Sequence, residues 1–196
     1  MGKILWENFN WDNKSEVKIE ESNLSIKAHP NSDCFINPAT GKKVLNSAYY
    51  YTEIAAEKDF IIKAKVSHEF KSIYDAGALM IKSSDTCWAK VCFECTYYGT
   101  NTVVSVVTNG RSDDANGTDI NQNAVYLQLI KKGNVFAMHY SLDAAEYRMV
   151  RYFTLPLSDT IKMGFTVQSP LGEGGLFKFE EIYLDYISVE DLKKGI

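Results

Sequence analysis

The sequence predicts an all-β fold, either a sandwich or a barrel. Its 196 residues contain roughly thirteen short stretches with the residue types and alternation of strands, bounded by turn residues. Aromatic residues, which favour strands, make up 13% of the chain. Many short strands with regularly spaced turns are typical of sandwiches and barrels. Because no linker rich in Pro, Gly or Ser interrupts the chain, we predict one domain over residues 1–196.

The predicted strands follow in order, each ended by polar or Gly-containing turns. Two clean alternations separated by Glu-Ser-Asn predict an early hairpin, and the run Thr102 to Thr108 is strongly β. Strands are expected at 4–9, 17–20, 24–27, 34–36, 49–54, 60–66, 75–96 (a hairpin), 102–108, 125–130, 135–140, 147–153, 161–167 and 176–189. Loops are expected at 29–47, 109–119 and 168–175, and helix-like pieces only at 54–58 and 189–194.

The hairpin at 75–96 carries the most informative pattern. In its second strand, one face consists of small and apolar side chains and is expected to join the core. The opposite face holds Trp88, Lys90 and Glu94, an aromatic residue and two opposite charges. We interpret this face as the floor of a groove for a polar ligand. In the first strand, both the Asp75/Leu79 face and the Ala76/Met80 face could form a core.

Composition excludes several classes of partner. The formal net charge is -4 and the pI about 5.4, so the surface repels phosphate backbones and no nucleic-acid partner is expected. No apolar run approaches the roughly 20 residues that span a bilayer, and the N-terminal residues do not resemble a signal peptide. We therefore expect a cytoplasmic protein without membrane partners. The sequence shows no dinucleotide or phosphate-binding motif, and no cofactor is expected.

Four cysteines are present, and two of them form a C-x-x-C motif. In a strand, residues three apart point to opposite faces, which opposes both a disulfide and a shared metal between Cys92 and Cys95. Reduced structural cysteines are therefore expected.

Six motifs in order resemble the regulation-of-enolase family of concanavalin A-like domains of unknown function. They are Asp33-Cys34-Phe35 with Pro38 and Gly41, Asp59-Phe60, Tyr74 to Ile81, Trp88-x-Lys90-x-Cys92-x-Glu94, Ser105 to Asn116, and Gln168 to Gly174. Cys92 stands where the family has Gly, and a Trp of the first motif is missing. The resemblance spans roughly 150 residues and implies a two-sheet antiparallel jelly-roll sandwich with one concave face.

The predicted function is binding of a glycan or another small polar ligand on this concave sheet. Trp88 would stack on a sugar ring, and charged side chains would hydrogen-bond its hydroxyl groups. The expected ligand-binding residues are Asp75, Trp88, Lys90, Glu94, Ser105, Asp113, Asp114, Asn116 and Gln168. No catalytic residue is assigned.

Two alternatives remain open. One is a glycoside hydrolase or glycan-modifying enzyme using Asp75 and Glu94, although the paired-carboxylate strand motif of related glucanases is absent and Lys90 would lower the pKa of Glu94. The other is a protein-interaction module that regulates a metabolic enzyme, as the family name implies. The acidic stretch 112–119 resembles a calcium loop only in part, so it is interpreted as a rim of the groove and no metal is assigned.

Overall fold

The computed structural model describes residues 4–196, and strands dominate it. The first large sheet, sheet A, has seven antiparallel strands with β1 and β11 at its edges. In spatial order it contains β1 (Phe9–Asp12), β6 (Ala48–Ala55), β15 (Thr160–Gln168), β8 (Ala76–Ser84), β9 (Cys87–Cys95), β10 (Asn101–Asn109) and β11 (Ser112–Asp119).

The second large sheet, sheet B, also has seven antiparallel strands. In spatial order it contains β14 (Arg148–Thr154), β13 (Val135–Ser141), β12 (Ala124–Lys132), β7 (Phe60–Ser67), β16 (Gly175–Asp185), β3 (Asn23–Ala28) and β2 (Val17–Glu20). A separate two-stranded hairpin is formed by β4 (Cys34–Ile36) and β5 (Lys43–Leu45).

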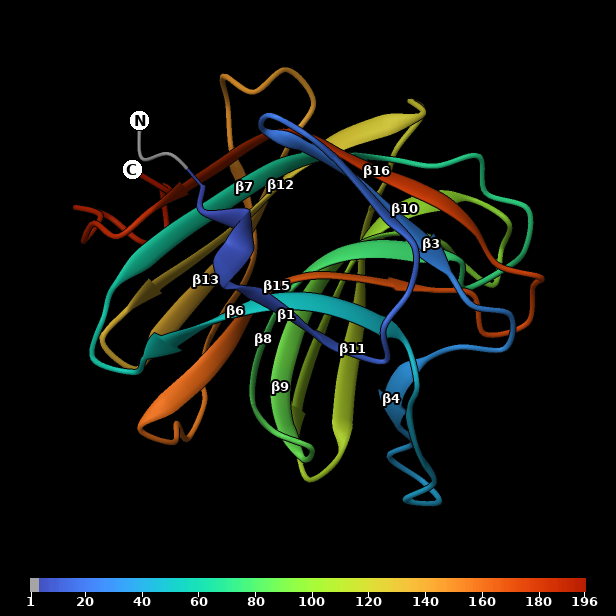
Figure 1. The fold of residues 1–196 in the computed structure, drawn as a ribbon, viewed down its shortest axis with the longest axis horizontal. Coiled ribbons are helices and arrows are strands. Elements are labelled where there is room, and N and C mark those ends of the chain that lie inside the picture. Colours follow the sequence, from blue (N-terminus) through green and yellow to red (C-terminus); the bar gives the residue numbers. More distant parts are fainter. Residues whose placement is uncertain (1–3) are drawn as a thin grey trace.

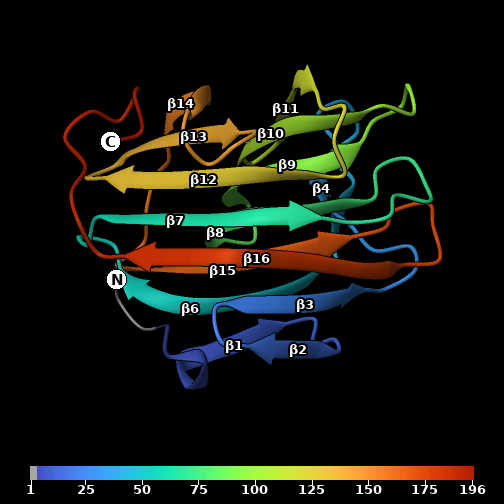
Figure 2. The same ribbon diagram turned by 90° about the horizontal axis from the view of Figure 1, so that it is seen from above.

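The two sheets form the layers of a sandwich, with sheet B in front of sheet A in Figure 2. The apolar faces of both sheets build one large core, which includes the fully buried residues Phe93, Val103, Leu127 and Phe179. Each strand alternates its side chains between the two faces, so one apolar face per sheet suffices to close this core. The predicted two-sheet antiparallel sandwich is confirmed.

The helix-like expectations are wrong. Residues 54–58 end β6 and turn, and residues 189–194 form turns after β16, so no α-helix occurs within residues 4–196. Residues 4–9 do not form a strand as predicted: a 3-10 turn at Trp6–Asn8 precedes β1. Within the described residues, no helix is long and apolar enough to cross a bilayer.

The predicted loop at 109–119 is mostly the edge strand β11. Gly110, at a φ of +76°, and Arg111 connect the two strands, and β11 pairs antiparallel with β10. An Asn-Gly pair between two strand-like runs is a strong hairpin signal, and here Gly110 supplies the positive φ. The polar composition of 112–119 concealed this strand, since edge strands often carry polar and charged residues.

The register of β8 and β9 decides which face of β8 is inward. Ala76 lies opposite Glu94 and Leu79 opposite Val91. Leu79 and Ile81 therefore enter the core between the sheets, whereas Ala76 and Met80 face away from sheet B.

Candidate functional site

The face of sheet A that points away from sheet B, here called the outer face, carries a second apolar cluster. Tyr49, Tyr51, Met80, Trp88 and Val106 belong to it, and all are buried although they lie outside the main core. Their burial is due to the β4–β5 hairpin, which contributes Cys34, Phe35 and Leu45 to the same cluster. Figure 1 shows this hairpin beside the curved strands of sheet A.

Two polar contacts fasten the hairpin to the outer face. The backbone N–H of Ile36 donates to the Ser112 Oγ at 2.9 Å, and the Lys90 Nζ donates to the Cys34 carbonyl oxygen at 2.9 Å. Both contacts are buried, so water competes for them only weakly. The hairpin therefore acts as a cover over the middle of the outer face.

This cover places Trp88 differently from the sequence interpretation. Trp88 does lie on the outer face, but its side chain is 0% exposed and its Nε1 has no hydrogen-bond partner among residues 4–196. A ligand cannot stack on a ring that protein already covers on both sides. The stacking role predicted for Trp88 is therefore not compatible with this structure, in which it is part of the apolar cluster.

A cavity of about 280 Å³ remains beside the hairpin, at the end of the outer face where Glu94 lies. The walls combine acidic, aromatic and apolar side chains: Asp33, Phe35, Tyr74, Lys90, Glu94, Val104, Val106, Asp114, Gln168 and Pro170. We call it the Glu94 cavity. It draws on β4, β8, β9, β10, β11 and β15 or the residues next to them, so it exists only in the folded chain.

Glu94 is the most unusual group in this cavity. It is 9% exposed, and its carboxyl group has no hydrogen-bond partner within the described residues 4–196. Burial raises the pKa of Glu94 to about 8, although Lys90 acts to lower it. Lys90 acts in the expected direction, but desolvation of the carboxylate outweighs this one charge, so the net shift of the pKa is upward.

Lys90 and Gln168 form a fixed pair on the cavity wall. The Lys90 Nζ donates to the Gln168 Oε1 at 2.5 Å, and the Gln168 Nε2 donates to the Tyr74 carbonyl oxygen at 3.3 Å. Lys90 is 1% exposed. Its ammonium group is thus held by two acceptors, this amide and the Cys34 carbonyl, and does not depend on Glu94.

Asp33 and Tyr74 are two of the wall residues that sequence reasoning did not select. Tyr74 is 36% exposed and adopts a φ of +68°, which is rare and strained for a bulky side chain. Asp33 accepts a hydrogen bond from the Cys34 N–H at 2.7 Å, and burial raises its pKa although Lys90 lowers it. Both residues lie in motifs that carry the family resemblance, and these motifs are the feature of the sequence that could have identified them.

The structure brings together only some of the nine predicted ligand residues. Lys90, Glu94, Asp114 and Gln168 line the Glu94 cavity. Asn116 lies on the same face of β11 as Asp114, since residues two apart share a face.

The other predicted residues lie elsewhere. Asp113 points to the opposite face of β11 and forms an ion pair with Arg151 at 3.0 Å. Ser105 alternates with the cavity residues Val104 and Val106, so it faces sheet B, where it is 0% exposed and its Oγ has no partner among the described residues. Neither side chain reaches the cavity.

Asp75 does not reach the cavity either. Because Ala76 lies opposite Glu94 on the outer face, Asp75 one residue earlier points inward, and it is 1% exposed. Asp75 and Glu94 therefore do not form the carboxylate pair that the hydrolase alternative required.

Cys34, Cys87 and Cys92 are buried, whereas Cys95 is half-buried. All four are free, and Cys92 and Cys95 lie on opposite faces of β9. Burial raises the pKa of Cys34 to about 11 and that of Cys92 further, which disfavours the reactive thiolate. Among residues 4–196, no three His, Cys, Asp or Glu side chains are grouped as metal ligands.

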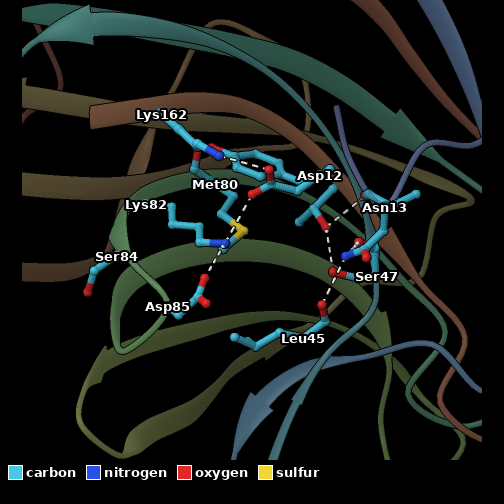
Figure 3. A network of polar contacts seen from close by, with 12 residues as sticks. Asp12, Asn13, Leu45, Ser47, Met80, Lys82, Ser84, Asp85 and Lys162 are labelled. Carbon is cyan, nitrogen blue, oxygen red and sulfur yellow. Dashed lines mark hydrogen bonds and ion pairs between the residues drawn. The ribbon is translucent and has the colours of Figure 1, made fainter. Parts of the chain in front are cut away.

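A second polar cluster lies at the other end of the outer face (Figure 3). Asp12 on β1 bridges two lysines: its Oδ1 accepts from Lys162 at 2.8 Å and its Oδ2 from Lys82 at 3.0 Å. Lys82 also pairs with Asp85 at 2.8 Å, and the Lys162 Nζ lies 4.1 Å from the centre of the Tyr51 ring. Lys82 and Lys162 are directly opposite on neighbouring strands, an arrangement that is unfavourable for like charges. Asp12 compensates both and ties the edge strand β1 to the sheet.

Replacing Asp12 by asparagine should lower the free energy of unfolding by about 1 kcal/mol at pH 7, a modest value because the pairs are partly exposed. Burial raises the pKa of Asp12, but its bonds and charges with Lys162 and Lys82 lower it more, so the net shift is downward. A carboxyl group with a lowered folded pKa stabilises the fold above its unfolded pKa, about 3.9, and this stability is lost as pH falls through the folded pKa. The difference should therefore shrink at about pH 3.

Urea unfolding of wild type and Asp12→Asn at both pH values measures this effect. The matched control is Asp85→Asn, because the Asp85 side chain is 67% exposed and contacts one lysine instead of two. A smaller loss is expected for the control. Equal stability of Asp12→Asn and wild type at pH 7 would contradict the bridging role.

Comparison with known proteins now identifies the family. A family model described as "Protein of unknown function (DUF1349)" matches residues 11–186. The chain belongs to the DUF1349 family. A Saccharomyces cerevisiae protein called "Regulation of enolase protein 1" is 28% identical over 168 residues, which cover 85% of this chain and 83% of that protein. The family resemblance seen in the sequence is thereby confirmed for this DUF1349 protein.

Solved structures agree with the fold. A functionally unknown protein from Saccharomyces cerevisiae has a TM-score of 0.85 at 24% identity, covering 94% of this DUF1349 chain and 99% of that chain. The carbohydrate-binding module CBM66 from Bacillus subtilis has a TM-score of 0.58 at 12% identity, covering 91% and 95%. A GH43 protein from Bacillus licheniformis has a TM-score of 0.66 at 9% identity, but only 39% of that chain is covered. At these identities the similarity concerns the fold alone.

Proposed function

We propose that this DUF1349 protein binds a small polar ligand of the carbohydrate class in the Glu94 cavity. The observation that carries the proposal is the buried carboxyl group of Glu94, which faces the cavity and has no hydrogen-bond partner among residues 4–196. Buried polar groups are nearly always hydrogen-bonded in folded proteins, and leaving one unpaired costs stability. A ligand hydroxyl group would supply the missing partner.

The cavity walls suit a sugar ring. Phe35 and Tyr74 offer aromatic surface for its C–H groups, while Gln168 and Asp114 offer polar atoms for its hydroxyl groups. Tyr74 takes over the stacking role that the sequence assigned to Trp88. The volume of about 280 Å³ lies at the lower end for ligand pockets, which indicates a ligand of about one ring. The fold similarity to a carbohydrate-binding module adds support.

A glycan array followed by calorimetry tests this proposal with wild type, Glu94→Met and Glu146→Met. Methionine keeps most of the volume of Glu94 but removes both oxygens, so we expect affinity to fall at least about tenfold, the equivalent of one lost hydrogen bond to a polar group. Glu146 is exposed in the turn after β13 of sheet B, so its variant should bind like wild type. Circular dichroism and thermal unfolding would establish that each variant is folded.

Two results would contradict the proposal. One is that wild type binds no glycan of the array. The other is that a folded Glu94→Met variant binds as tightly as wild type, which would place the ligand outside this cavity.

A second candidate is regulation of a metabolic enzyme through protein contact, supported by the Saccharomyces cerevisiae relative and its name. The exposed Tyr97 and Tyr98, which are 71% and 81% exposed in the turn between β9 and β10, provide a contact surface. Aromatic residues of this kind are enriched in protein interfaces. The direct test is enolase turnover with and without the purified chain, and unchanged turnover would contradict this candidate.

A further inference from the structure

The Glu94 cavity has an excess of acidic groups. Asp33, Glu94 and Asp114 line it, whereas Lys90 is the one basic residue on its wall in the part of the chain that the structure describes. With every group ionised, three negative charges and one positive charge leave two negative charges in excess. The Lys90 ammonium is already engaged by the Cys34 carbonyl oxygen and the Gln168 side chain.

The charge of Glu94 is only partly stabilised, because the attraction of Lys90 does not offset the cost of burial. It is nine-tenths buried, it faces the cavity, and no hydrogen bond to it exists within residues 4–196. Burial raises the pKa of Glu94 to about 8, so its carboxyl group is mostly protonated at pH 7 in the empty cavity, and a cation placed beside it would favour the charged form. The aromatic rings of Phe35 and Tyr74 on the same walls are also surfaces that attract cations.

We propose that the cavity selects a ligand with a positively charged amine, and within the carbohydrate class a hexosamine with a free amino group. This inference rests on the proposed function and names its ligand class. The ammonium group would lie against Glu94 and receive further attraction from Asp33 and Asp114, while the ring lies against Tyr74. The parent hexose differs from the hexosamine in lacking the positive charge. The N-acetylated sugar also lacks the charge and is larger.

The test compares glucosamine, galactosamine and mannosamine with their parent hexoses and N-acetyl forms by calorimetry at pH 7 and about 0.15 M salt, where surface attractions are screened. At least one hexosamine should bind about tenfold or more tightly than its parent hexose, because ion pairs in a desolvated site exceed neutral hydrogen bonds. Glu94→Gln keeps a hydrogen-bonding group but cannot ionise. It should abolish this preference, so that the amine and its parent hexose bind the variant with equal affinity.

The matched control is Asp113→Asn, since Asp113 is on the same strand as Asp114 but on the opposite face, paired with Arg151. This variant should keep the wild-type preference. Equal affinity for amine and parent, or an amine preference that survives in Glu94→Gln, would overturn the inference. Those results leave carbohydrate binding itself intact, whereas absence of binding to every arrayed glycan and every hexosamine would overturn both proposals.

Discussion

Replacement of Trp88 by alanine should lower the free energy of unfolding by about 3–5 kcal/mol, the range for truncating a large buried aromatic side chain. Trp88 is 0% exposed and packs in the apolar cluster between sheet A and the β4–β5 hairpin. Its removal would leave a cavity and loosen the hairpin that covers Lys90. Urea unfolding followed by circular dichroism measures the loss.

Trp88→Phe serves as the matched variant. Phenylalanine keeps most of the apolar contact and removes the indole N–H, which has no partner among the described residues. We expect a smaller loss of stability than for alanine, and unchanged ligand binding. If Trp88→Ala were as stable as wild type and bound no ligand, Trp88 would be part of the binding site and the structural role would be wrong.

The second large effect is expected for Asp75→Ala, which should lower the free energy of unfolding by about 3 kcal/mol, because one buried and two partly buried donors lose their acceptor at once. The Asp75 Oδ1 accepts a hydrogen bond from the Ser169 Oγ at 2.6 Å. Its Oδ2 accepts from the backbone N–H groups of Lys71 and Ser72 at 3.2 Å and 3.0 Å. Asp75 thereby holds the 71–75 turn against the loop after β15.

Chemical unfolding of Asp75→Ala beside Asp159→Ala tests this role. Asp159 is exposed, and its side chain makes no hydrogen bond within the described residues, so its variant should differ little from wild type. If Asp75→Ala kept wild-type stability but lost ligand binding, the predicted ligand role of Asp75 would have to be restored.

Much of the fold could be read from residue patterns. The alternation in β9 correctly separated Val91 and Phe93, which enter the core, from Lys90 and Glu94, which do not. Alternation is local, because the pleat alone sends successive side chains to opposite faces. The same reasoning could not orient β8, since both of its faces are apolar, and the register with β9 decided this.

The candidate site was predictable only in part for a related reason. Lys90, Glu94, Asp114 and Gln168 do meet, although they come from strands far apart in the sequence. Asp75, Ser105 and Asp113 were chosen by composition and motif. Each is one position away in sequence from a residue that faces outward, so its side chain points to the opposite side of sheet A. Asp33 and Tyr74 lie outside regular strands, where no period indicates direction.

Residue patterns predicted an all-β sandwich or barrel, the family resemblance narrowed this to an antiparallel sandwich, and alternation placed an aromatic residue and two opposite charges of β9 away from the core. Neither indicated that the β4–β5 hairpin covers this face, which depends on how the folded chain packs. That cover buries Trp88, engages Lys90 and leaves the Glu94 carboxyl group in a small cavity, without a hydrogen-bond partner among the described residues. The physical reason is that burial depends on which distant segment packs on a face, and no local pattern of residues encodes it.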